Sequence, residues 1–299
     1  MTHRATLKRP VDCEGTGLHC GRSVRMQLKP AAAGHGVRFV RTDCGVEIPA
    51  SVEYLARLDH ATRLSRDGAA IHTVEHLLAA LRAMGVDDVL VALDGPEVPV
   101  LDGSSEPFVR LIQTAGLRSH DVARQHIKIL EVVEVQRGDA SVRVTPADDF
   151  RVSYTIAFDH PLLRRQSASY AVTAESFASA IAPARTFGFL SEVDALRRNG
   201  LALGATLDNA VVIGEHGLLN PLRFEDEFVR HKILDAIGDL SLLGHPLLGH
   251  VEAWRAGHAL HAALARKLLA TPQAWSLAST PRANPVLDRP SPRLVLQPS

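Results

Sequence analysis

The order of strand-like and helix-like segments, which occurs twice along the 299 residues, most constrains the fold of this chain. In the first part, period-two alternation or a short apolar run predicts strands at 23–28, 36–40 and 88–93. Apolar residues at helical spacing predict helices at 73–84 and 106–115, each followed by a glycine that can end it. This combination indicates a sheet with helices packed on it.

The second part of the chain has the same coarse order, although no residue-level repeat relates the two parts. A polar stretch at 118–125 precedes it and is interpreted as a domain boundary. Strands are expected from 126 to about 172 and again at 250–254, and a last helix is expected at 258–269. Further helices are expected near Ala174, Ser191 and Phe224.

We therefore predict an α+β fold with two layered domains, residues 1–120 and 126–280. The segment 281–299 is predicted to be an extended tail because its prolines break helices.

The charge balance excludes several classes of protein. The 33 basic residues equal the 33 acidic ones and form no basic patch, so no nucleic-acid partner is expected. The apolar runs fall short of the ~20 residues that a membrane-spanning helix needs. The N-terminus lacks the apolar core of a secretory signal, and three scattered cysteines do not form a disulfide framework. We expect a cytoplasmic protein without an integral membrane segment.

Three side chains recur at helical spacing late in the chain. His231, Asp235 and Asp239 are four residues apart and form one column on a predicted helix, with Ile233 and Ile237 on its other side. Such a column alone is most often a surface ion-pair pattern. A catalytic role needs further groups from elsewhere in the chain.

Glu75 and His76, at the start of the predicted helix at 73–84, are candidates for those groups. A catalytic zinc ion takes three imidazole or carboxylate ligands and leaves a fourth position for water. His76, His231 and Asp235 form such a set, and the neighbouring Glu75 is suited to accept a proton from the attacking water. The residues thus predict a zinc-dependent hydrolase.

Two other interpretations stay open at this point. The stretch from His72 to His76 matches H-x-x-E-H, the signature of inverted-zincin metalloproteases, in which both histidines would bind zinc. That interpretation needs a third ligand and leaves the column of His231, Asp235 and Asp239 without a purpose. The other is a non-catalytic metal-binding scaffold, against which Glu75 argues because metal storage needs no base.

Several blocks together resemble the UDP-3-O-acyl-N-acetylglucosamine deacetylases, the zinc amidases that commit Gram-negative bacteria to lipid A synthesis. The resemblance implies two similar two-layer α/β sandwich domains, each with a sheet packed on helices and a small insert, and an active site between the domains. The matching blocks cover nearly the whole chain and lie at 17–19, 73–76, 96–99, 101–104, 184–189, 222–232 and 257–260.

The same resemblance implies catalytic roles. Glu75 would be the general base, and His258 the protonated histidine that acts as general acid for the leaving amine. Asp239 would hold the imidazole of His258 and favour its charged form. The ligands of Zn²⁺ would be His76, His231 and Asp235.

The resemblance also implies a substrate site for UDP-3-O-acyl-N-acetylglucosamine, and we expect the enzyme to be a monomer. Thr186 would assist the oxyanion, Phe187 would line the sugar pocket, and Lys232 would bring a cation to the carbonyl or diphosphate. His19 would be a polar contact near the phosphates, although a structural histidine in a turn explains it equally well. The segment 190–212 would shape a channel for the acyl chain with Leu201, Leu203 and Leu207.

Overall fold

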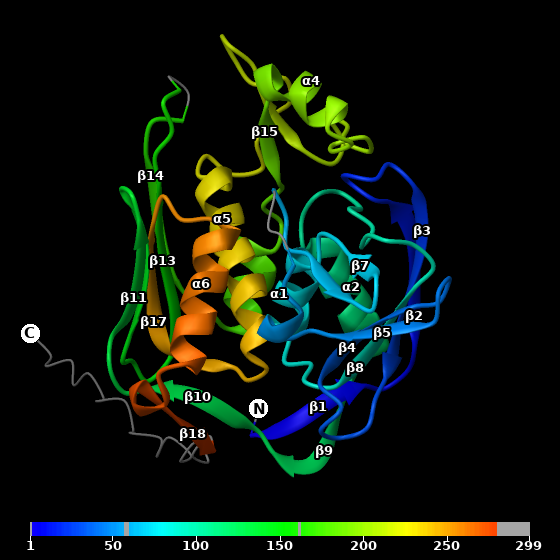
Figure 1. The fold of residues 1–299 in the computed structure, drawn as a ribbon, viewed down its shortest axis with the longest axis vertical. Helices are drawn as coiled ribbons and strands as arrows, with labels where there is room; N and C mark the ends of the chain where they lie inside the picture. The colour runs from blue at the N-terminus through cyan, green and yellow to red at the C-terminus, as the bar shows by residue number, and fades with distance from the viewer. Residues whose placement is uncertain (1, 57–59, 161–162, 280–299) are drawn as a thin grey trace, which may run out of the picture.

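The computed structural model describes residues 2–279 except 57–59 and 161–162 (Figure 1). The predicted tail at 281–299 lies outside these described residues.

Two sheets lie on opposite sides of a central group of helices (Figure 1). The helices are α1 (Glu75–Ala83), α2 (Glu106–Ala115), α5 (Glu227–Leu240) and α6 (His258–Leu269). Almost every side chain of α5 is buried, because neighbouring elements surround it on all sides. The predicted mixed α+β fold, with sheets packed against helices, is confirmed.

The first sheet has five strands in the order β2-β3-β8-β4-β5. β8 is antiparallel to β3 and parallel to β4, so Val91 of β8 lies opposite both Leu28 and Phe39, and all three are buried. The strands are β2 (Val11–Thr16), β3 (Ser23–Pro30), β4 (Val37–Arg41), β5 (Val46–Pro49) and β8 (Val89–Leu93).

The second sheet has seven strands and is built around β17, which is antiparallel to β12 and parallel to β13. Buried and partly exposed residues alternate along all eight residues of β17, the pattern of a sheet with one face on a core. The strands are β10 (Gln125–Ile129), β11 (Val133–Arg137), β12 (Ala140–Thr145), β13 (Phe150–Ile156), β14 (Gln166–Ala171), β17 (Leu247–Trp254) and β18 (Trp275–Ser279).

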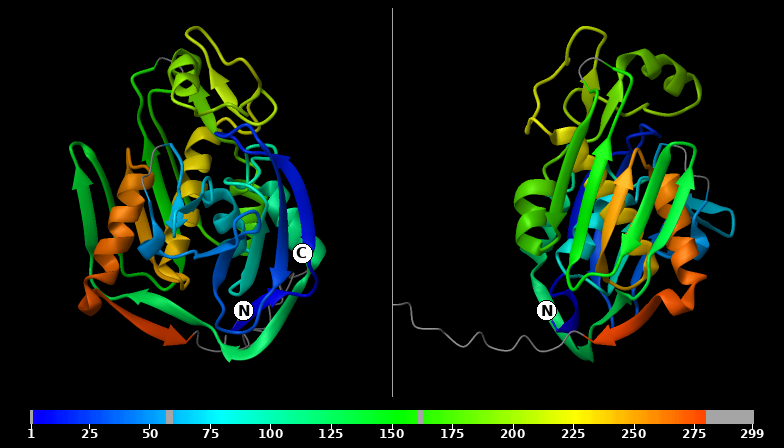
Figure 2. Two further views of the ribbon diagram at one scale, coloured as in Figure 1. Left: turned by 45° about the vertical axis from the view of Figure 1, so that its right-hand side comes forward. Right: turned by 90° about the vertical axis from the view of Figure 1, so that its left-hand side faces the viewer.

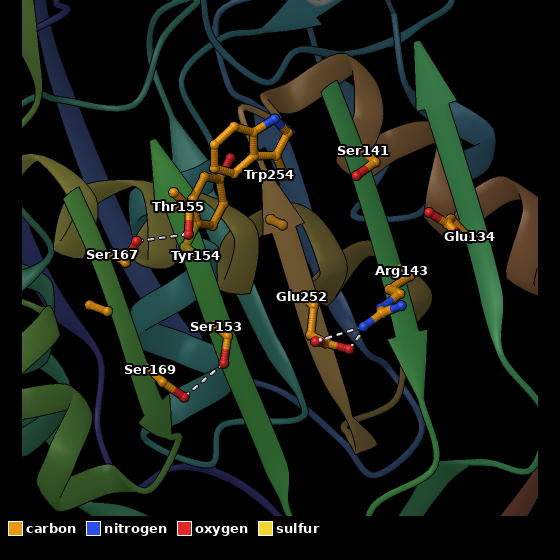
Figure 3. Close-up of a pocket in the computed structure, with 12 residues that line it drawn as sticks. Glu134, Ser141, Arg143, Ser153, Tyr154, Thr155, Ser167, Ser169, Glu252 and Trp254 are labelled. Carbon is orange, nitrogen blue, oxygen red and sulfur yellow. Dashed lines mark hydrogen bonds and ion pairs between the residues drawn. The ribbon is translucent and has the colours of Figure 1, made fainter. Parts of the chain in front are cut away.

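The face of this sheet that points away from the helices is polar (Figure 3). The hydroxyls of Ser153 and Ser169 lie 2.7 Å apart across β13 and β14, and Arg143 donates to Glu252 at 2.8 Å. The alternation of the strands therefore directs apolar side chains towards the helices.

A small unit lies at the top of Figure 1, beyond the ends of the central helices. It contains α4 (Leu190–Arg198) and the parallel pair of β15 (Phe187–Phe189) with β16 (Val211–Ile213). This unit includes the predicted insert at 190–212 and lies at the top of both views of Figure 2. The backbone N–H groups of Leu203 and Gly204 connect it to the carbonyl groups of His19 and Leu18, in the turn between β2 and β3.

Some predicted elements differ from the structure. The polar stretch at 118–125 largely forms β9 (Leu117–Ala123), which pairs with β1 (His3–Leu7). Its side chains are mostly exposed, so the strand lacks the apolar alternation that identifies strands in a sequence. The helix expected near Ala174 is only the short α3 (Ala174–Ser176), and α5 begins at Glu227 rather than near Phe224.

Within the described part of the chain, no helix has the length and apolar character needed to cross a membrane.

Candidate active site

The structure brings together the three side chains that the sequence predicts as metal ligands. His76 lies in the first turn of α1, and His231 and Asp235 lie one turn apart on α5. One ligand atom from each lies within 4.8 Å of the others. The Oδ1 of Asp235 is 3.3 Å from the Nε2 of His231 and 3.7 Å from the Nε2 of His76. These separations suit three ligands around one small cation.

The chemistry of this group also fits a metal ion. The Oδ1 of Asp235 is buried, and no described residue donates a hydrogen bond to it, which is costly for a carboxylate oxygen unless a cation is its partner. The Nδ1 of His231 is 3.1 Å from the carbonyl oxygen of Ala184, which directs Nε2 towards Asp235. Burial lowers the pKa of His76 to about 3 and also lowers that of His231, so both are neutral, as ligands must be.

Glu75 lies beside this group and is 2% exposed. Its Oε2 accepts a hydrogen bond of 3.0 Å from the backbone N–H of Thr62. Burial raises the pKa of Glu75 to about 8. A carboxylate with a raised pKa next to three candidate metal ligands has the properties of a general base.

His258, in the first turn of α6, faces the same site from the other side. Its Nδ1 is 2.8 Å from the Oδ2 of Asp239, and its Nε2 is 3.9 Å from Asp235. Burial acts to lower the pKa of His258, but the charge and hydrogen bond of Asp239 outweigh it and raise the pKa to about 9. His258 is therefore a charged donor at neutral pH.

Asp239 is held by more partners than the sequence indicates. The hydroxyl of Thr62 donates to its Oδ1, and the Nδ1 of His261 is 2.8 Å from its Oδ2. The Nε2 of His261 is in turn 3.1 Å from the hydroxyl of Tyr154. Burial acts to raise the pKa of Asp239, but these histidines hold it below its ordinary value. Sequence reasoning missed these partners, and only the i, i+3 spacing of His258 and His261 gave a signal for one of them.

Lys232 contacts one of the candidate ligands directly, because its Nζ lies 2.6 Å from the Oδ2 of Asp235. Burial acts to lower the pKa of this ammonium, but Asp235 reverses the effect and raises it. Lys232 is thus a cation at the rim of the site.

A cavity of about 230 Å³ opens beside these groups. Thr186, Phe187 and His19, which the sequence predicts as substrate contacts, all line it, as do Glu75 and His258. The sequence analysis gave no role to seven further residues that line this cavity, which are Leu18, His60, Thr73, Phe158, Gly188, Phe189 and Glu192.

His72 does not lie with the candidate ligands His76, His231 and Asp235. Inverted zincins need His72 and His76 on one helix, but α1 begins at Glu75, and Thr73 between them has a φ of +58°. The backbone of His72 instead bonds to Pro96 and Val98. The H-x-x-E-H match is therefore accidental.

A model of the family described as UDP-3-O-acyl N-acetylglycosamine deacetylase matches residues 4–270. This chain belongs to that family. The deacetylase from Myxococcus xanthus is 48% identical over 284 residues, which cover 94% of this chain and 90% of that protein. The deacetylase from Syntrophotalea carbinolica is 47% identical over 95% of this chain and 93% of its own length. Both relatives carry the name UDP-3-O-acyl-N-acetylglucosamine deacetylase.

Proposed function

We propose that this chain is a zinc-dependent amidase that removes acetate from UDP-3-O-acyl-N-acetylglucosamine in lipid A biosynthesis. The observation that carries the proposal is the meeting of the His76, His231 and Asp235 ligand atoms within 4.8 Å, beside Glu75 and His258. Membership of the deacetylase family supplies the substrate.

His76, His231 and Asp235 would hold the ion, for which Zn²⁺ is the natural choice with two imidazoles and one carboxylate. Bound there, zinc supplies Lewis-acid polarisation of a carbonyl and acidification of water. The Oδ2 of Asp235 also contacts the Nζ of Lys232. A positive charge therefore lies beside the ligands and can face the substrate.

Glu75 removes a proton from the attacking water. The N–H of Thr62 holds one of its oxygens, which orients the carboxylate without occupying both oxygens. The water oxygen forms a bond to the acetamide carbon, and the carbonyl oxygen gains negative charge that Thr186 and Lys232 face in the cavity.

His258 then gives a proton to the sugar nitrogen as the C–N bond breaks, and the acid that leaves loses its remaining proton to solvent as acetate. Asp239 keeps this imidazole charged and oriented through the 2.8 Å contact at Nδ1, which leaves Nε2 free to donate into the cavity. One carboxylate that accepts and one imidazolium that donates complete the proton balance.

The remaining parts of the site suit the rest of the substrate. Phe187 is half-buried at the cavity and suits a sugar face, and His19 suits a polar contact to the diphosphate. In the insert, Leu203 is 51% exposed and Leu207 is 47% exposed, which suits an apolar channel for the acyl chain together with Leu201.

We further propose that residues 1–120 and 126–280 are two similar two-layer sandwich domains with the active site between them. The separation of the two sheets by the central helices supports this division. A monomer in the cytoplasm without a nucleic-acid partner accords with the balanced charge.

Acetate release from UDP-3-O-acyl-N-acetylglucosamine by the purified, zinc-loaded protein tests the proposal. We expect multiple turnovers by the unchanged protein, and none by His231→Ala because it loses a metal ligand. Zinc bound at one ion per chain without acetate release would identify a metal-binding scaffold instead. Cleavage of a peptide substrate would favour a protease.

A further inference from the structure

Glu97 is a fully buried carboxylate that the proposed mechanism does not use. Its Oε1 accepts a hydrogen bond of 2.7 Å from the hydroxyl of Thr73 and one of 2.9 Å from the backbone N–H of His19. Its Oε2 accepts one of 2.8 Å from the backbone N–H of Cys20 and a longer one of 3.1 Å from the N–H of His19. Thr73 and His19 both line the catalytic cavity, so Glu97 joins two segments of its wall.

The donors around Glu97 are neutral, yet together they keep it charged. Burial acts to raise the pKa of this carboxyl, but the N–H of Cys20, the hydroxyl of Thr73 and the N–H of His19 outweigh it and lower the pKa. A buried carboxylate that satisfies several donors is costly to replace, because each donor would lose its partner.

The first segment contains Thr73, whose φ of +58° is unusual for a β-branched residue. Such a conformation costs ~1–3 kcal/mol and persists only where surrounding contacts enforce it. Here the contacts are the bond to Glu97 and the backbone bonds that pair His72 with the strand-like segment at 96–98. α1 begins two residues later with Glu75, so this turn sets the position of the proposed base and of His76.

The second segment is the turn that carries His19. The Nδ1 of His19 accepts a bond of 3.3 Å from the N–H of Ala202, so its Nε2 carries the proton. This Nε2 is buried, and no described residue accepts a hydrogen bond from it. A Cβ on the neighbouring Gly17 would lie 2.5 Å from the Oε2 of Glu97, so a glycine makes room for the carboxylate. The bonds to Glu97 fix this turn and thereby the place of the His19 imidazole.

We propose that Glu97 is a positioning residue that holds the His19 turn and the Thr73 turn in one fixed relation. This inference rests on the proposed deacetylase function. Glu97 thereby affects two stages of the reaction. It affects substrate binding through the position of His19, and turnover through the positions of Glu75 and His76. The hydrogen-bonding capacity of Glu97, rather than its volume, performs this role.

Two variants of similar volume separate hydrogen bonding from packing. Glu97→Gln keeps one oxygen for the two backbone N–H groups, and its NH₂ can donate to the Thr73 hydroxyl, which can also accept. Glu97→Met fills the same space without an acceptor. We expect kcat/KM to fall roughly a hundredfold in Glu97→Met, because displacement of catalytic groups by about 1 Å has this effect. We expect Glu97→Gln to stay within about fivefold of the unchanged enzyme.

Double-mutant cycles assign the loss to each segment. Thr73→Val removes the same bond from the other side, so Glu97→Met should lower kcat less in that background than in the unchanged enzyme. His19→Ala should raise KM, and Glu97→Met should raise KM less when His19 is already absent.

Asp88→Asn is the matched control, because Asp88 is also a fully buried carboxylate but pairs with Arg4 away from the cavity. It should lower thermal stability and leave kcat and KM within about twofold.

Hydrogen exchange gives a measure that does not depend on activity. The amides of His19 and Cys20 should exchange faster in Glu97→Met than in Glu97→Gln, whether or not the protein hydrolyses the proposed substrate.

Equal kcat/KM in the Met and Gln variants, or fully additive cycles, would overturn the role of Glu97. Absence of acetate release from the unchanged enzyme would instead refute the proposed function, while the exchange rates would still report on Glu97. Should Glu97→Met fail to fold, the cycle of Thr73→Val with Glu97→Gln tests the same bond.

Discussion

α5 and α1 supply the candidate metal ligands in different ways. On α5, His231 and Asp235 lie within a continuous, buried helix, and its regular period alone puts them on one face. On α1, Glu75 and His76 are the first residues of the helix, and the N-cap Val74 makes no side-chain cap bond. Their position depends on the strained turn at Thr73 and on contacts from distant segments.

The two helices meet at Gly238 of α5. A Cβ at this position would lie 2.1 Å from the backbone oxygen of Glu75 and 2.7 Å from its carbonyl carbon. Glycine is therefore needed for the close approach that brings His76 to His231 and Asp235. One half of the site is therefore fixed by helix geometry, and the other half by tertiary contacts.

The largest effect is expected from Glu75→Gln on α1, which tests whether Glu75 takes part in the chemical step without binding the metal. Glu75→Gln should lower kcat by roughly a hundredfold to ten-thousandfold, because the general base is lost. Zinc content measured by atomic absorption should stay near one ion per chain, since Glu75 is outside the ligand set. A variant with full turnover would exclude Glu75 as the base.

A methyl group at the helix contact tests whether close approach is required. Gly238→Ala should push α1 away from α5, lower kcat/KM by roughly a hundredfold and weaken zinc binding. Overpacking of this kind also costs ~1–3 kcal/mol of stability, which a thermal melt can detect. Gly217→Ala is the control, because nothing lies within 4 Å of a Cβ there. Unchanged zinc affinity in Gly238→Ala would show that the helices need not approach so closely.

The pH profile tests the acid that α5 supports. His258 must be protonated and Glu75 deprotonated to act, so activity should rise as the pH passes through the pKa of Glu75 and fall as the pH rises through the pKa of His258, about 9. Asp239→Asn removes the charge that raises this pKa, so the alkaline limb of kcat/KM should move to lower pH. Loss of this partner should also lower activity at neutral pH by roughly tenfold. An alkaline limb that stays in place would contradict the pairing of His258 with Asp239.

The smallest expected effect concerns His72, just before the strained turn. His72→Ala should keep both zinc content and kcat within about twofold, because its backbone makes the contacts with Pro96 and Val98. Loss of zinc from this variant would revive the inverted-zincin interpretation.

Much of the site was predictable where the signal was local. The spacing of His231, Asp235 and Asp239 indicated one helical face, and the apolar pattern at 106–115 and 258–269 predicted α2 and α6 to the residue. The polar strand β9 and the late start of α5 were not predicted, because neither has a distinctive apolar pattern.

Helix period and residue chemistry are local properties, so the α5 column and the kinds of side chain that a metal hydrolase needs could be recognised in the amino-acid sequence. Three other features became visible only in the folded chain: Thr62 supports Asp239 from 177 residues away, Glu97 joins two turns, and His72 lies outside the group of candidate ligands. The physical reason is that these contacts join segments that are distant along the chain, and only packing of the helices and sheets brings such segments within hydrogen-bonding distance.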